Sequence, residues 1–142
     1  MSGHILITLV YFLTTACQGI TLLRGYSGVL SSPNYPQNYP PNSNCVWKIS
    51  SPPGTKFVVF HFQDFHLEGS STCSYDYIEI RNGNSPTSHL LKKLCGSKIT
   101  SAKIVTGPSA FIRFRSDNTV NRKGFRAAYH VGTNIQGTAG LY

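Results

Sequence analysis

The chain has 142 residues, with 13 Lys and Arg against 5 Asp and Glu, a net charge of +8 and 4 cysteines. This length fits one compact domain with a buried core and is too short for two. The positive balance favours acidic partners such as sulfated glycans, anionic lipids or nucleic acid, although a solvated basic surface explains it equally well. The basic residues are scattered, and no run is longer than two.

An apolar segment lies near the start of the chain, from Ile5 to Leu13, and small residues follow at 14–16. This order is typical of a secretory signal peptide, although no Lys or Arg precedes it; a buried strand is the alternative. The run is shorter than the roughly 20 apolar residues that span a bilayer, and no later run is longer. We therefore predict a signal peptide over 1–16 and a secreted, extracellular protein with no transmembrane segment and no nucleic-acid partner.

Secretion makes disulfides the expected state of the four cysteines, Cys17, Cys45, Cys73 and Cys95. They form no CxxC pair, so neither a zinc site nor a redox site is indicated. Cleavage after residue 16 keeps all four and permits two bridges. Cleavage after Gly19 would instead remove the first cysteine and leave an odd number, which is disfavoured in a secreted chain.

Short β-rich runs, separated by clusters of Gly, Pro, Asn and Ser, predict an all-β fold. In chain order, a run at 28–32 leads into a loop rich in Pro and Tyr at 33–42, and strands are expected at 45–50 and 56–62. In the second of these, Val58, Phe60 and Phe62 share one face.

The later strands alternate in the same way. Around 75–80, Ile78 and Ile80 are expected to face inward and Glu79 outward. A strand at 110–115 directs Ala110, Ile112 and Phe114 inward and Arg113 and Arg115 outward, and 124–131 is the last strand. Residues 132–142 are small and polar, typical of a tail or linker. Strands at this spacing predict an antiparallel β-sandwich of two sheets packed face to face.

Three of the five acidic residues, Glu68, Asp76 and Asp117, lie at the ends of predicted strands. Scarce carboxylates that converge there indicate a hard-cation site, because calcium prefers several oxygen ligands. The alternative is three isolated surface carboxylates. Close together and uncompensated they would repel one another, which favours a bound ion.

From Gly28 to Val131 the sequence closely resembles the CUB domain family, and the order and spacing of the matching pieces carry the resemblance. These pieces are 32–40 (SPNYPQNYP), 45–47 (CVW), 65–68 (FHLE), 73–76 (CSYD), 78–80 (IEI), 94–96 (LCG), 114–117 (FRSD) and 123–125 (KGF). The resemblance implies a jelly-roll β-sandwich over 17–131, extracellular, acting in protein or glycan recognition. It also implies disulfides Cys17–Cys45 and Cys73–Cys95.

For the calcium-binding members of the family, the resemblance implies that Glu68, Asp76 and Asp117 are the carboxylate ligands. Backbone oxygens of Thr119 and Val120 would complete the shell. The resemblance also implies that Tyr39 steadies the site; ordinary packing of its loop is the alternative. A Lys or Arg of an extracellular protein partner would then be received by the acidic residues around the calcium.

Enzymatic activity is not predicted, because the chain has no HExxH motif, no GxSxG motif and no phosphate-binding glycine loop. Two alternatives to calcium-dependent protein recognition stay open. The first is a secreted protein similar to the spermadhesins that binds sulfated glycans or heparin, with Arg113 and Arg115 as candidate contacts. The second is a fragment of a protease that contains CUB domains.

Overall fold

The computed structural model describes residues 17, 19–97 and 103–133, and these residues form nine β-strands. The predicted signal peptide, and the predicted tail beyond residue 133, lie outside them. The strands are β1 (Ile20–Leu23), β2 (Ser27–Ser31), β3 (Asn44–Ser50), β4 (Phe57–His66), β5 (Tyr77–Asn82), β6 (His89–Leu94), β7 (Ile104–Thr106), β8 (Ser109–Arg115) and β9 (Gly124–Gly132).

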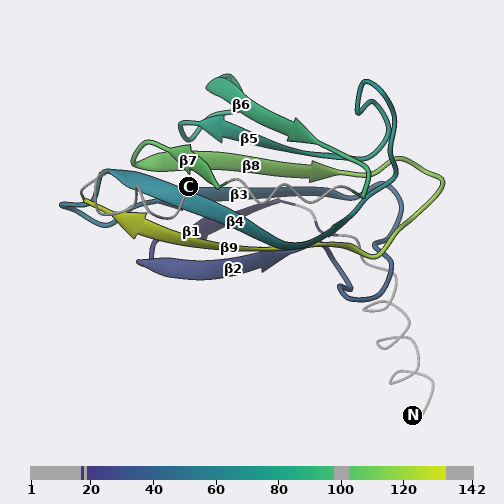
Figure 1. The fold of residues 1–142 in the computed structure, drawn as a ribbon, viewed down its shortest axis with the longest axis horizontal. Coiled ribbons are helices and arrows are strands. Elements are labelled where there is room, and N and C mark those ends of the chain that lie inside the picture. The colour runs from purple at the N-terminus through teal and green to yellow at the C-terminus, as the bar shows by residue number, and fades with distance from the viewer. Residues whose placement is uncertain (1–16, 18, 98–102, 134–142) are drawn as a thin grey trace, which may run out of the picture.

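The strands make two sheets that face each other (Figure 1). The five-stranded sheet has the order β1-β3-β8-β5-β6, and the four-stranded sheet has the order β2-β9-β4-β7. All neighbouring strands in these sheets are antiparallel except β1 and β3. The predicted β-sandwich is therefore confirmed, with one parallel edge pair that the sequence pattern did not predict.

Aromatic and branched side chains from the inner faces of both sheets fill the core. Phe125 of β9 contacts Phe114 and Trp47 of the opposite sheet edge-on, with ring centroids 5.5 and 6.0 Å apart. Tyr39 joins this group, because its ring lies 5.0 Å from that of Phe114. Such edge-to-face contacts favour a single arrangement of the rings beyond the area they bury.

The predicted inward faces of β4, β5 and β8 are buried, as the alternation indicated. Glu79 follows the predicted outward alternation, yet it is only 5% exposed. Its carboxylate is covered because it pairs with Arg81 at 3.0 Å and Arg113 at 3.3 Å. Val59, on the opposite face of β4 from Val58, is also fully buried.

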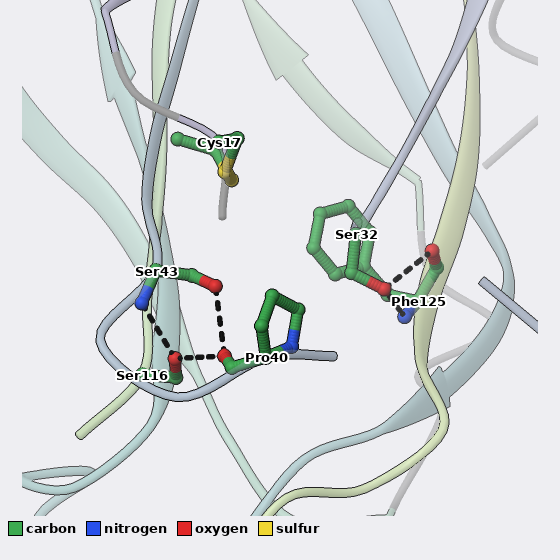
Figure 2. The surroundings of a disulfide bond; sticks show 7 residues. Cys17, Ser32, Pro40, Ser43, Ser116 and Phe125 are labelled. Atoms are coloured by element: carbon green, nitrogen blue, oxygen red, sulfur yellow. Dashed lines mark hydrogen bonds between the residues drawn. A yellow bond between two sulfur atoms is a disulfide. The ribbon is translucent and has the colours of Figure 1, made fainter. Parts of the chain in front are cut away.

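Both predicted disulfides, Cys17–Cys45 and Cys73–Cys95, are present. Figure 2 shows the first of them beside a group of hydrogen-bonded loop residues. The backbone N–H of Ser43 donates to Ser116 Oγ at 2.9 Å, and that hydroxyl donates to the Pro40 carbonyl at 2.9 Å. These bonds join the β2–β3 connection, residues 32–43, to the end of β8.

A second attachment fixes the start of the β2–β3 connection to β9. Ser32 Oγ accepts a 2.9 Å hydrogen bond from the N–H of Phe125 (Figure 2). The approach is so close that a Cβ on Gly124 would lie 1.8 Å from that oxygen. Glycine is required there for a second reason, because its φ of +94° is one that other residues rarely adopt.

Candidate metal centre

Three loop segments meet at one end of the sandwich, where β4 and β8 end and β5 begins (Figure 1). Each contributes one carboxylate: Glu68 follows β4, Asp76 precedes β5 and Asp117 follows β8. One carboxylate oxygen of each lies within 4.8 Å of the others. We call these three residues the acidic cluster. The structure thus brings together the three acids that the sequence analysis selected.

Tyr39 contacts two members of the acidic cluster and is only 1% exposed. Its hydroxyl donates to Asp76 Oδ2 at 2.6 Å and accepts the backbone N–H of Glu68 at 3.2 Å. Burial, together with the hydrogen bond to Asp76, raises the pKa of Tyr39, so the phenol stays protonated and remains a donor. Tyr39 therefore orients two members of the cluster through one oxygen.

Asp76 is fully buried. Its Oδ2 is held by Tyr39, and its Oδ1 accepts the backbone N–H of Asp117 at 2.8 Å. Burial raises the pKa of Asp76 above its ordinary value, and the neighbouring charge of Asp117 also raises it. A buried carboxylate in this position needs more compensation than two donors when it is ionised.

Glu68 lacks even that compensation. Its Oε1 is buried and has no hydrogen-bond partner. Burial raises the pKa of Glu68, followed by the charges of Asp117 and Asp76. Buried polar atoms are nearly always paired in proteins, so an unpartnered carboxylate oxygen on a member of this cluster favours a cation as the missing partner.

The donor set fits calcium. Two oxygens that bind one calcium ion at 2.3–2.6 Å lie at most about 5 Å apart, and the oxygens of the acidic cluster satisfy that limit. All three donors are carboxylate oxygens, which suit a hard cation better than zinc or copper. Bound calcium would supply positive charge to three carboxylates that otherwise repel one another.

The β8–β9 connection, residues 116–123, carries the two predicted backbone ligands, Thr119 and Val120. The N–H of Thr119 donates to Asp117 Oδ1 at 3.2 Å, a local turn in which an Asp side chain binds the backbone two residues on. Val120 has a φ of 55° and is 43% exposed. This left-handed conformation is unusual for a β-branched residue and marks local strain. The roles of their carbonyls stay predictions.

The two candidate glycan contacts, Arg113 and Arg115, lie on the outer face of β8. Arg113 donates to Glu79, so part of its charge is compensated, whereas Arg115 is exposed. The strand register places Lys93 opposite Glu79 on the same face. This face therefore has more cations than the sequence analysis assigned to it.

Sequence reasoning missed one group of polar residues near this end of the sandwich. Asp64 of β4 binds Tyr35, His66 and Lys123 through its two oxygens. The sequence analysis assigned no contact to these side chains, because their pairing depends on loops that are distant in the chain. The segments quoted for the family resemblance contain all three partners of Asp64, but they carry no pattern that predicts the contacts.

Comparison with known proteins identifies the fold and the family together. The model of the CUB domain family matches residues 17–129. The chain belongs to the CUB domain family. Human Tolloid-like protein 1 is 41% identical over 103 residues, which cover 72% of this chain and 10% of that protein. Human cubilin is 35% identical over 119 residues, 81% of this chain and 3% of that protein.

Solved CUB structures superpose on the same region. The CUB2 domain of MASP-1 bound to Ca²⁺ has a TM-score of 0.68 and 34% identity, covering 80% of this chain and 99% of that one. The CUB1-EGF-CUB2 domain of human MASP-1/3 gives 0.71 and 33%, covering 83% and 43%. The CUB domain described here spans only 10% of Tolloid-like protein 1 and 3% of cubilin, a small part of the curated relatives it matches.

Among the described residues, no helix has the length and apolarity needed to cross a membrane.

Proposed function

We propose that this CUB domain is secreted, binds one calcium ion through Glu68, Asp76 and Asp117, and recognises an extracellular protein. The single observation that carries the proposal is the acidic cluster, with its oxygens within 4.8 Å and a buried, unpartnered Glu68 Oε1. The similarity to a CUB domain solved with Ca²⁺ supports the choice of ion. No catalytic role is proposed for these residues.

The ion has two roles in this proposal. It compensates the three carboxylates. It also holds the β8–β9 connection, because the carbonyl oxygens of Thr119 and Val120 in that connection bind the ion. The negative charge that remains around it then receives a Lys or Arg of the protein partner. Charge-assisted hydrogen bonds of this kind are stronger than neutral ones. The loops that calcium orders would therefore form the recognition surface.

Calorimetry and thermal denaturation, each with calcium and with chelator, test the proposal. We expect a dissociation constant of roughly 10⁻⁴ to 10⁻³ M, as in other extracellular modules, and a higher melting temperature in calcium. Asp117→Ala is expected to remove both effects. Glu79→Gln is the matched control, because it changes a buried carboxylate that is paired with arginines outside the acidic cluster. No heat of binding to the unsubstituted domain would refute the calcium site.

A second candidate function is binding of a sulfated glycan by the outer face of the five-stranded sheet. Strand register places five cations on that face, with Glu79 as the carboxylate among them; the cations are Lys48, Arg81, Lys93, Arg113 and Arg115. Glu79 is paired with Arg81 and Arg113. The cations of this face outnumber that one carboxylate, so the face keeps a net positive charge. A linear polyanion could contact several cations of such an array at once.

Heparin chromatography separates the two candidates. If the face binds glycan, Arg115→Ala combined with Lys93→Ala lowers the salt concentration at elution, and chelator does not. Lys56→Ala is the control, since Lys56 is an exposed cation in the β3–β4 turn outside this face. Elution of the unsubstituted domain at or below physiological salt would mean that the face is only solvated. The remaining hypothesis, a piece of a protease that contains CUB domains, stays a prediction.

A further inference from the structure

Asp64 occupies a β-bulge in β4, at the end of the sandwich that carries the acidic cluster. The register of β4 against β9 shifts between Phe62 and Asp64. Bulges commonly redirect a side chain, and here Asp64 reaches two loops. Its Oδ2 accepts the Tyr35 hydroxyl at 2.6 Å and Lys123 Nζ at 2.7 Å.

The other oxygen of Asp64 is also occupied. Its Oδ1 accepts His66 Nε2 at 2.9 Å and the N–H of Phe65 at 3.1 Å. Lys123 Nζ also lies over the Tyr35 ring, 5.6 Å from its centroid. Asp64, Tyr35 and Lys123 therefore form one connected group, which we call the Asp64 clamp. Its side-chain carboxylate is 18% exposed.

The clamp joins the three segments that also carry the calcium-site residues. Tyr35 belongs to the β2–β3 connection, which contains Tyr39. Lys123 belongs to the β8–β9 connection, which contains Asp117. Asp64 itself lies four residues before Glu68 on the segment that leaves β4.

The two connections are also bonded to each other between the clamp and the acidic cluster. The N–H of Tyr39 donates to the Arg122 carbonyl at 3.0 Å, and the N–H of Asn42 donates to the Asp117 carbonyl at 2.9 Å. A displacement of either connection at the clamp would thus be transmitted along hydrogen-bonded backbone. Asp117 lies at the start of the β8–β9 connection, and Tyr39 of the β2–β3 connection bonds to the other two acids of the cluster.

We infer that Asp64 is a positioning residue for calcium: it sets the calcium affinity without contacting the ion, by fixing both loops in the geometry that the acidic cluster requires. The inference rests on the proposed calcium site. When the clamp is intact, the loops are already ordered in the folded domain, so the free energy of calcium binding does not include the cost of ordering them. When the clamp is broken, calcium must order the loops itself and binds more weakly.

Calcium titration of clamp variants, performed well below the melting temperature, tests this inference. Asp64→Asn removes the negative charge of the Asp64–Lys123 ion pair, and Lys123→Met removes its positive charge. Each is expected to raise the dissociation constant for calcium about fivefold, a coupling at the lower end of the usual range between distinct sites. The double variant is expected to bind like either single one, because both break the same contact.

Two further variants distinguish positioning from general stability. Lys123→Arg keeps the charge and the donors, and is expected to restore the affinity of the unsubstituted domain. Glu79→Gln also breaks a buried ion pair, but on β5 of the five-stranded sheet, so it is expected to lower the melting temperature and leave the calcium affinity unchanged. Asp64→Asn can impair folding, and in that case Lys123→Met alone still decides the question.

The outcomes separate this inference from the proposed function. Failure of the unsubstituted domain to bind calcium would overturn both. Normal calcium binding by folded Asp64→Asn and Lys123→Met, with affinities equal to that of the unsubstituted domain, would overturn only the role of the clamp. A weakening by Glu79→Gln as large as that by Lys123→Met would show a general effect of stability, and would also overturn it.

Discussion

The hydroxyl of Tyr39 donates a 2.6 Å hydrogen bond to Asp76, and both residues are buried. The two belong to different connections between the sheets: Tyr39 lies between β2 and β3, and Asp76 lies between β4 and β5. The same oxygen accepts the N–H of Glu68. One phenol therefore fixes the relative position of two proposed calcium ligands, and its removal has consequences that can be measured.

Tyr39→Phe should lower both stability and calcium affinity. The substitution keeps the ring that packs on Phe114 but leaves the Glu68 N–H without its acceptor and Asp76 with one donor fewer. Leaving a buried polar group unpaired costs about 1–3 kcal/mol. Urea denaturation in chelator measures that cost, and calcium titration measures the second effect. Unchanged values in both would mean that Tyr39 only packs.

Glu68→Gln should stabilise the calcium-free domain at neutral pH and abolish its response to calcium. The pKa of Glu68 is raised by burial and then by Asp117 and Asp76, so the folded state holds this proton more tightly than the unfolded state. Ionisation therefore destabilises the fold, and in chelator the stability falls as the pH rises from the ordinary carboxyl value of about 4.3 through the raised pKa.

Melting temperatures in chelator between pH 4 and pH 7 test the direction of this pH dependence. The unsubstituted domain should lose stability towards pH 7, and Glu68→Gln should lose less. Asp64→Asn serves as a comparison, because Asp64 is the acid with the opposite shift. A parallel decline in the unsubstituted domain and in Glu68→Gln would contradict the prediction.

Asp64 should contribute stability that disappears only in strong acid. Hydrogen bonds from Lys123, and then from Tyr35, lower the pKa of Asp64 to about 2. Because the folded-state value is depressed, the contribution is present above the ordinary value of about 3.9 and is lost as the pH falls towards 2. Urea midpoints of the unsubstituted domain and Asp64→Asn should differ at pH 6 and converge near pH 2. A difference independent of pH would indicate lost packing.

Val120→Asn should raise the free energy of unfolding by about 1 kcal/mol. Val120 adopts a φ of 55°, and left-handed backbone costs a β-branched residue roughly that much, whereas Asn tolerates it. The substitution keeps the backbone carbonyl, so the calcium response should remain. Val29→Asn is the control, because Val29 is similarly exposed but lies in strand β2. A lower melting temperature for Val120→Asn would contradict the strain argument.

Local sequence patterns were enough to predict the all-β class and the inward faces of several strands, and the family resemblance predicted both disulfides and the three acids. Alternation along a strand is a local property, since successive side chains point to opposite faces. It therefore predicted the burial of Ile78 and Ile80 without knowledge of their neighbours. It did not predict β1, because a short strand with exposed Ile20 and Leu22 carries no such pattern.

Which polar groups compensate one another depends on how the two sheets pack, and local patterns did not predict it. Glu79 follows the outward alternation, yet it is buried because two arginines from its own strand and from β8 cover it. Asp64 meets Tyr35 across 29 residues of sequence, and Asp76 meets Asp117 across 41. These pairings follow from which loops the two sheets bring to one end of the sandwich. Partners so far apart in the chain leave no periodic pattern, and the physical effects that depend on them, shifted pKa values and a shared cation site, emerge only when the sheets pack.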